Sequence, residues 1–329
     1  MPQAYSADWL FPGDGPAIPR GVVIVDQGRI AAVERSAPTG VPLQHFEHCA
    51  LLPGLVNAHT HLEFSALPSP LEPRTCFPEW IRAVVSWRRE QPLDINAHVQ
   101  GVTESQTCGT SVIGEIATRE WLDQKGFRPP ESCLFVAFRE LLGLRPEATA
   151  AQLEIAEQHL RQPASPGIVR GLSPHAPYSV HPQLLNRLMM LAQEHAVPVA
   201  MHLAETRDEL ELLDSGTGPL VDLLNDFGVW DPEFIPRGSK PLDYLRPLSQ
   251  AERGLVIHGN YLSDEELDFL TRHPQLSVVY CPRTHAAMGH PPHPWQAMQQ
   301  RGINVCIGTD SRASNPDLSI WEELRLLQG

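Results

Sequence analysis

Lysine is scarce in this sequence of 329 residues: Lys125 and Lys240 are the only two, beside 23 arginines. Any chemistry that requires a lysine side chain therefore has to use one of these two residues. Long apolar runs are missing as well, because no stretch reaches the roughly 18 consecutive apolar residues of a membrane span. The N-terminal segment also lacks the apolar run of a signal peptide. We therefore expect a cytoplasmic protein that does not enter the membrane.

Paired cysteines and an excess of positive charge are also absent. The six cysteines are scattered without any C-x-x-C pair, so their pattern predicts buried free thiols and argues against a disulfide framework. Basic residues number 25 against 39 acidic ones, a formal net charge of −14. A protein this acidic is a poor partner for a nucleic-acid backbone or an anionic membrane.

The sequence does contain a regular alternation of short apolar runs and longer amphipathic stretches. Eight apolar runs follow one another, at residues 51–58, 110–116, 133–138, 168–172, 197–203, 254–258, 276–281 and 304–308. Helical patterns separate most of them, at 78–90, 94–107, 147–161, 182–195, 207–227, 264–273, 294–301 and 317–327. Buried parallel strands have continuous apolar runs, and eight of them alternating with helices indicate a (β/α)₈ barrel. An open doubly wound sheet is disfavoured, because no glycine-rich phosphate turn follows an early run.

The fold class we predict is α/β, with two domains. Residues 51–329 form a (β/α)₈ TIM-type barrel, and residues 1–50 form a small β domain. In the small domain, two β-branched runs, 22–25 and 30–33, flank Asp26-Gln27-Gly28, which is a hairpin-type turn signal.

Metal-binding side chains gather where the predicted strands end. His59 and His61 end the first strand, His202 ends the fifth, and Asp310 follows the eighth. The active site of such a barrel lies at the C-terminal ends of its strands, and residues two apart on a strand face the same side. A histidine-x-histidine pattern alone arises by chance in a chain with 15 histidines, so the convergence of several strand ends carries the inference. Imidazoles and a carboxylate suit Zn²⁺, Fe²⁺ or Mn²⁺.

Five ordered motifs resemble the amidohydrolase superfamily. The similarity is strongest to its branch of atrazine/triazine hydrolases, guanine deaminases and S-adenosylhomocysteine or aminofutalosine deaminases, and it spans residues 20–328. The motifs are PGLVNAHTHLE at 53–63, SPHAPYS at 173–179, HLAET at 202–206, GTDS at 308–311 and DSRASN at 310–315.

The resemblance implies a role for each matched residue. One divalent metal ion, Zn²⁺ by preference and Fe²⁺ as the alternative, would be held by His59, His61, His202 and Asp310. Three residues would be catalytic: Glu205 shuttles protons to a ring nitrogen, His258 orients the attacking hydroxide, and Asp310 handles the proton of water. Four residues match substrate-binding positions, namely His175, Ser314, Glu79 and Arg139.

The scarcity of lysine bears on the number of metal ions. Binuclear members of this superfamily bridge two ions with a carboxylated lysine at the end of the fourth strand. The fourth run here, 168–172, holds no lysine, and the resemblance therefore implies a mononuclear centre. Glu115, near the end of the second run, is another carboxylate that could bridge metals, but we expect it to face the core or pair with a loop.

The function implied is hydrolytic deamination of an amino-substituted heterocycle or nucleoside, a small-molecule partner. Two alternatives share the same metal site, a triazine chlorohydrolase or aminohydrolase and a cyclic amidase. A more distant alternative is a non-catalytic barrel that only binds metal. A homodimer is expected because it is common among similar proteins. Such proteins continue past the eighth strand into segments that complete the small β domain, so we expect residues 1–50 to form an incomplete β-sandwich with exposed edges.

Overall fold

A computed structural model describes residues 1–92, 94–122, 127 and 129–328, so Lys125 and Gly329 lie outside the described residues. The chain divides into two compact units, Met1–Leu55 and Val56–Gly329. Among the helices of the described residues, none has both the length and the apolar character needed to cross a bilayer.

The first unit is a five-stranded sheet. Its strands are β1 (Gln3–Leu10), β2 (Ile18–Pro19), β3 (Val22–Asp26), β4 (Arg29–Glu34) and β5 (Leu43–Leu51). The sheet order is β2-β1-β3-β4, with β5 parallel to β1. The predicted hairpin is confirmed: β3 and β4 are antiparallel, and both turn residues have positive φ, 50° at Gln27 and 74° at Gly28. Two positive φ values match the twist of the flanking strands, as in a type I′ turn.

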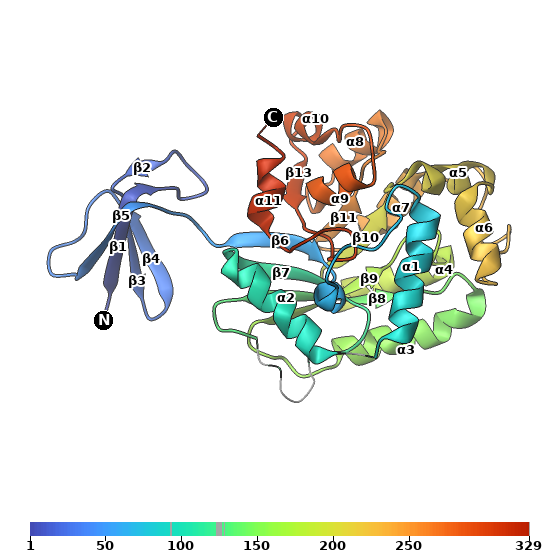
Figure 1. Ribbon diagram of the computed structural model, residues 1–329, viewed down its shortest axis with the longest axis horizontal. Helices are drawn as coiled ribbons and strands as arrows, with labels where there is room; N and C mark the ends of the chain where they lie inside the picture. Colours follow the sequence, from blue (N-terminus) through green and yellow to red (C-terminus); the bar gives the residue numbers. More distant parts are fainter. Residues whose placement is uncertain (93, 123–126, 128, 329) are drawn as a thin grey trace. The chain divides into compact units, whose positions relative to one another are not determined.

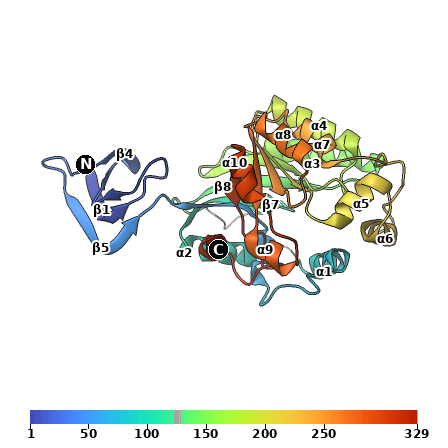
Figure 2. The ribbon, with the colours of Figure 1, turned by 90° about the horizontal axis from the view of Figure 1, so that it is seen from above.

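The second unit is a nearly closed barrel of eight parallel strands (Figures 1 and 2). Neighbours in the chain are neighbours in the sheet, in the order β6 (Leu55–Thr60), β7 (Thr110–Ala117), β8 (Leu134–Leu141), β9 (Ile168–Pro174), β10 (Val199–Leu203), β11 (Gly254–His258), β12 (Leu276–Tyr280) and β13 (Asn304–Ile307). The ring closes where the Asp310 amide donates to the His59 carbonyl over 3.0 Å. The predicted barrel is therefore confirmed. Its first strand begins later than expected, because Leu51 belongs to β5 and Pro53-Gly54 interrupts the run.

Helices surround the strands on the outside (Figure 2). They are η1 (Leu62–Ala66), α1 (Phe77–Glu90), α2 (Ile95–Thr107), η2 (Pro146–Ala148), α3 (Thr149–Leu160), α4 (Pro182–Glu194), α5 (Arg207–Ser215), α6 (Pro219–Asp226), α7 (Pro241–Leu248), α8 (Asp264–Thr271), α9 (Pro282–Ala287), α10 (Trp295–Gln300) and α11 (Ile320–Arg325). The single helix predicted at 207–227 is in fact two. Gly216 ends α5 in the left-handed region at φ 68°, and Gly218 at φ 99° precedes the proline that starts α6. Helices α7 and α9 were not predicted.

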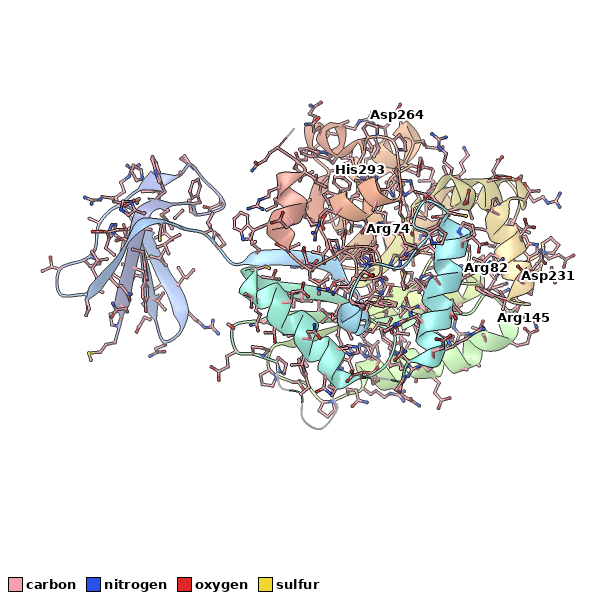
Figure 3. All side chains as sticks on the ribbon, in the orientation of Figure 1. Arg74, Arg82, Arg145, Asp231, Asp264 and His293 are labelled. Carbon is pink, nitrogen blue, oxygen red and sulfur yellow. The ribbon has the colours of Figure 1, made fainter. Side chains whose placement is uncertain are left out.

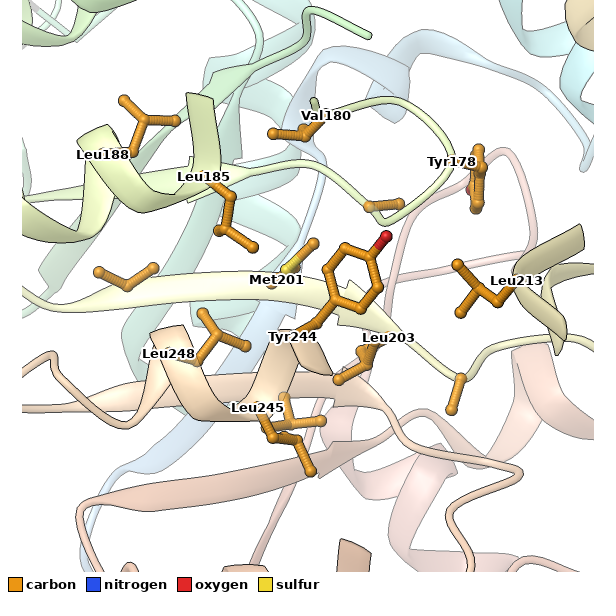
Figure 4. Close-up of a cluster of buried hydrophobic side chains, with 14 of the residues drawn as sticks. Tyr178, Val180, Leu185, Leu188, Met201, Leu203, Leu213, Tyr244, Leu245 and Leu248 are labelled. Atoms are coloured by element: carbon orange, nitrogen blue, oxygen red, sulfur yellow. The ribbon is translucent and has the colours of Figure 1, made fainter. Parts of the chain in front are cut away.

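Strand β10 shows how the barrel separates its two faces. Met201 and Leu203 point outward into a cluster that includes Leu185 of α4 and Leu245 of α7 (Figure 4). Ala200 belongs to a separate cluster, with residues of β7, β8, β11 and β12, in the barrel interior. Because side chains alternate along a strand, His202 shares the inward face with Ala200.

Gly114 on β7 marks a place where the barrel interior has no room for a side chain. A Cβ atom there would lie 2.4 Å from the carbonyl oxygen of Ala58 on the neighbouring strand β6. We therefore expect Gly114→Ala to lower the free energy of unfolding by about 2–3 kcal/mol, since overpacking forces backbone shifts. Urea denaturation measures this, with Met190→Ala on the exposed side of α4 as the near-neutral control. Equal midpoints for the two variants would contradict the packing described here.

Candidate metal centre

Four buried side chains from three strand ends meet at one mouth of the barrel. His59 lies on β6, His61 just after it, His202 on β10, and Asp310 after β13. Asp310 Oδ1 lies 3.5 Å from His59 Nε2 and 3.9 Å from His61 Nε2. Ligand atoms of His59, His61 and Asp310 lie within 4.8 Å of one another, and those of His59, His202 and His258 do so as well. The structure thus brings together all four residues expected to bind a metal.

Several ring nitrogens of these histidines have no hydrogen-bond partner in the described part of the chain and are free to coordinate a cation. Neither ring nitrogen of His59, nor Nδ1 of His61, has a hydrogen-bond partner although all three atoms are buried. His202 Nδ1 lies 3.0 Å from the His175 carbonyl oxygen, so Nδ1 carries the proton and Nε2 keeps its lone pair. A buried polar atom without a partner is costly, and coordination to a metal removes that cost.

The protonation states of the group also suit metal binding. Burial, helped by the neighbouring His59, lowers the pKa of His61 to about 3. Burial also holds the pKa of His202 well below its ordinary value, and the surrounding histidines add to this effect. Burial alone would raise the pKa of Asp310, but the close approach and charge of His59 and the charge of His61 bring it below its ordinary value. Neutral imidazoles beside an ionised carboxylate are the forms that bind a divalent metal.

The backbone conformation of Asp310 and a hydrogen bond from Ser314 set the position of its carboxylate. Its φ of 55° places the residue in the left-handed region, where it turns sharply out of the barrel wall. Ser314 Oγ donates to Asp310 Oδ2 over 2.8 Å, so Oδ1 remains directed at the histidines. Ser314 itself is completely buried and does not line the cavity. The structure therefore places this expected substrate-binding residue against the carboxylate.

Glu205 and His258 form a second pair beside these ligands. Glu205 Oε1 lies 3.4 Å from His258 Nε2, and both side chains are buried. Burial first, and then the charge of Asp310, raises the pKa of Glu205 well above its ordinary value. A carboxyl group with a raised pKa retains its proton to higher pH than an exposed one, which suits a proton donor. The carbonyl oxygen of His258 lies 3.0 Å from Nε2 of His293, labelled in Figure 3, which anchors this strand end.

A cavity of about 480 Å³ extends from these residues. Its polar end is lined by His61, His175, His202, Glu205, His258 and Asp310. Its remote end is apolar, with walls from α1 and α6 that include Phe77, Trp80, Ile81, Val84, Leu223, Leu224 and Phe227. The lining also includes three arginines, Arg88, Arg89 and Arg145. A pocket of this size and character can bury most of a drug-sized molecule.

The remaining expected substrate-binding residues have different positions. His175 lines the cavity, and its Nδ1 lies 2.7 Å from Ser179 Oγ. Glu79 does not line it: the side chain is exposed on α1, where Oε1 accepts from Arg82 Nε over 3.2 Å. Arg139 does not line it either, because a guanidinium nitrogen donates to the Ala117 carbonyl over 3.2 Å.

Glu140, the residue after Arg139, was missed by the sequence reasoning. Two positions beyond the inward-facing Phe138, it lies on the inner face of β8, with Oε1 3.9 Å from His175 Nε2. Oε2 of Glu140 lies 3.7 Å from the guanidinium of Arg88, a cavity-lining residue of α1. Burial alone would raise the pKa of Glu140, but Arg88 and His175 lower it to about 2. Strict alternation along the strand would have selected Glu140 in place of Arg139.

Glu115 and Lys240 bear on the number of metal ions. Glu115 Oε2 accepts from the Leu62 amide over 3.0 Å, which is the loop-pairing role expected for it. Lys240 precedes α7, and its exposed Nζ lies 3.4 Å from Glu265. No lysine of the described residues lines the cavity.

Comparison with known proteins finds relatives in sequence and in structure that are similar to one another in their named activity. A model of the amidohydrolase family matches residues 50–328. The 5-methylthioadenosine/S-adenosylhomocysteine deaminase of Shouchella clausii is 27% identical over 319 residues, covering 93% of this chain and 68% of the relative. The solved aminofutalosine deaminase of Helicobacter pylori, in complex with methylthio-coformycin, superposes with a TM-score of 0.83 at 21% identity, over 98% of this chain and 80% of that one. A zinc-bound adenosine deaminase structure from Xanthomonas campestris gives a TM-score of 0.71 at 24% identity, over 99% and 72% of the two chains.

Proposed function

We propose that this chain, which belongs to the amidohydrolase family, is a metal-dependent deaminase of an amino-substituted heterocycle of the adenosine type. The observation that carries the proposal is the position of Glu205, a buried carboxyl group with a raised pKa, beside the histidines and Asp310 at one end of the cavity. Names of relatives such as the 5-methylthioadenosine/S-adenosylhomocysteine deaminase support the choice of a nucleoside.

His59, His61, His202 and Asp310 would hold the metal. Three nitrogen donors and one carboxylate are a donor set that suits Zn²⁺, with Fe²⁺ as the alternative, and a zinc-bound relative supports zinc. When bound, the metal supplies Lewis acidity and lowers the pKa of a water molecule, so that the water can lose a proton and attack at neutral pH.

The proton transfers would be divided between two carboxyl groups. Asp310, which is ionised, accepts a proton from the water that attacks the ring carbon bearing the amino group. Glu205 donates its proton to the adjacent ring nitrogen, so that the ring does not become an anion. Asp310 then passes its proton to the departing nitrogen, and Glu205 recovers a proton from the hydroxyl group or ring nitrogen of the product. The products are ammonia and the hydroxyl-substituted heterocycle or its keto tautomer. His258, 3.4 Å from Glu205, orients the attacking water.

The two ends of the cavity suggest how the substrate lies. The heterocycle would occupy the polar end, and a substituent would occupy the apolar end between α1 and α6. We therefore expect a nucleoside with an apolar substituent on its 5′ carbon to have a kcat/KM at least 10-fold above that of adenosine, because burying two or more methylene groups contributes about 1.6 kcal/mol or more.

Product analysis distinguishes this function from its alternatives. The metal-loaded protein is incubated with adenosine, 5′-methylthioadenosine, guanine, a chlorotriazine and a cyclic amide, and all products are quantified. The proposal predicts one ammonia for each nucleoside consumed. Chloride release or a ring-opened carboxylate, without ammonia, would support a triazine hydrolase or a cyclic amidase instead. Absence of turnover across the panel would favour the non-catalytic barrel.

A further inference from the structure

We infer that Glu209 and Asn260 are positioning residues that hold the backbone of Glu205 where its carboxyl group can transfer a proton. The inference rests on the proposed role of Glu205 and adds two residues to the catalytic machinery. Neither residue lines the cavity, so each would act through Glu205 and not on the substrate itself.

Side chains from two different elements bind the peptide groups on both sides of Glu205. Glu209 on α5 accepts the Ala204 amide at Oε1 over 2.8 Å and the Glu205 amide at Oε2 over 3.0 Å. Asn260, which follows β11, donates from Nδ2 to the Glu205 carbonyl oxygen over 2.9 Å. The segment that carries the catalytic carboxyl group is therefore fixed at three backbone atoms.

The use of Glu209 differs from ordinary helix capping. Thr206 precedes α5, and its Oγ1 accepts from the Glu209 amide over 3.2 Å, which is half of a capping box. In a full capping box the glutamate returns to the amide of the capping residue itself. Here both carboxylate oxygens are directed instead to the two amides that precede Thr206. The carboxyl group of Glu209 therefore organises the Glu205 segment in addition to the helix end.

The backbone at this point needs such support. Ala204 has φ 53°, a left-handed conformation that is unfavourable for a residue with a Cβ atom and persists only where its surroundings enforce it. Glu209 is completely buried, and both of its carboxylate oxygens accept backbone amides. Burial raises the pKa of Glu209 to about 7, so the fold retains a carboxyl group at a place where charge is disfavoured. The amides of Ala204 and Glu205 each bind one oxygen of this carboxyl group, whereas a glutamine side chain has only one oxygen.

The orientation of the Asn260 amide follows from its partner. The Glu205 carbonyl oxygen can only accept, so the NH₂ group of Asn260 has to face it. Asn260 is itself buried, beside His285 of α9. Asn260 therefore links the Glu205 segment to the chain that follows β11.

The test combines Glu209→Gln with Asn260→Leu, and uses Glu211→Gln, exposed on the same helix, as the matched control. We expect Glu209→Gln and Asn260→Leu each to lower kcat 10- to 100-fold. KM and metal content should stay within two-fold of the parent, and Glu211→Gln should match the parent throughout. If Glu209→Gln does not fold, Asn260→Leu carries the test, since it removes one donor at similar volume.

A double-mutant cycle separates positioning from a general structural effect. In a Glu205→Gln background, the further change Glu209→Gln should have less than a two-fold effect on the residual kcat, because the group it positions is already inactive. An undiminished 10- to 100-fold effect in that background would overturn the inference.

A crystal structure provides a readout that does not depend on the reaction. In Glu209→Gln the Glu205 carboxyl group should move away from His258 Nε2, from which it lies 3.4 Å in the parent. An unchanged position would overturn the inference even if the protein proves to be a deaminase. A displaced carboxyl group in a protein without any deaminase activity would instead support the inference and contradict the proposed function.

Discussion

Replacing Glu205 by glutamine should lower kcat for ammonia release by about 10³-fold, while the metal content should stay at the parent level. Glutamine has nearly the same shape as glutamate, so the cavity and the proposed ligands His59, His61, His202 and Asp310 are left intact. It cannot release a proton to the ring nitrogen, because an amide is not an acid at neutral pH. The substrate would then have to accept negative charge on the ring during attack.

The measurement needs three readouts from one preparation of Glu205→Gln: steady-state kinetics, metal content by elemental analysis, and thermal stability. The exposed residue Glu211 provides the control, since Glu211→Gln makes the same chemical change outside the cavity. Full activity of Glu205→Gln with bound metal would exclude Glu205 as the proton donor.

We expect Asp310→Asn to lower both the metal content and kcat. The substitution removes the carboxylate that lies 3.5 Å from His59 and 3.9 Å from His61, which is the proposed anionic ligand and the proposed proton acceptor. We expect metal content below about a tenth of the parent value and a loss of at least 10⁴-fold in kcat, because the nucleophile depends on the metal. The variant should fold, since asparagine can still accept the hydrogen bond from Ser314.

Asp264→Asn is the matched control for Asp310→Asn. Asp264, labelled in Figure 3, is exposed on α8. It pairs with Arg301, and loss of this exposed pair should change neither metal content nor activity. Retention of a full metal complement by Asp310→Asn would show that this carboxylate is not a required ligand. The contrast with Glu205→Gln tests whether Glu205 handles protons alone and Asp310 also binds the metal.

The positions of the expected metal ligands could be predicted because few rules determine them. Parallel strands have continuous apolar runs here, with His59 and His202 next to the last residue of a strand and Asp310 just after one. This pattern is sufficient to place the three residues at one barrel mouth. Errors arose where a position depends on side-chain direction. Arg139 was chosen although alternation from Phe138 places Glu140 on the inner face, and Ser314 turned out to face the carboxylate of Asp310.

The remote end of the cavity could not be predicted from the sequence. It forms where α1 meets α6, and these helices are well over a hundred residues apart in the chain. Arg82 of α1 and Asp226 of α6 form an ion pair across this junction, with 2.5 Å between guanidinium nitrogen and carboxylate oxygen. No local pattern marks such a contact, which depends on how the whole barrel arranges its outer helices. Glu79, one turn before Arg82, was therefore assigned to the cavity although its side chain is exposed.

Cysteine burial was also overestimated from neighbouring residues. Cys133 and Cys281 are buried as expected, whereas Cys49 and Cys76 are exposed. Cys49 belongs to β5, whose side chains are mostly exposed in the first unit, and Cys76 precedes α1. Apolar neighbours in the sequence do not determine which face of a strand or which end of a helix reaches solvent.

The most direct test of a mononuclear metal-dependent deaminase is a metal titration of the metal-free protein. The protein is stripped with a chelator, Zn²⁺ is added in steps, and ammonia release from a 5′-substituted adenosine is measured at each step, with bound zinc quantified in the same samples. The account predicts no ammonia release without metal, a linear rise up to one zinc per chain, and a plateau beyond it. Deamination by the metal-free protein, a requirement for two zinc ions, or no ammonia at full loading would contradict it.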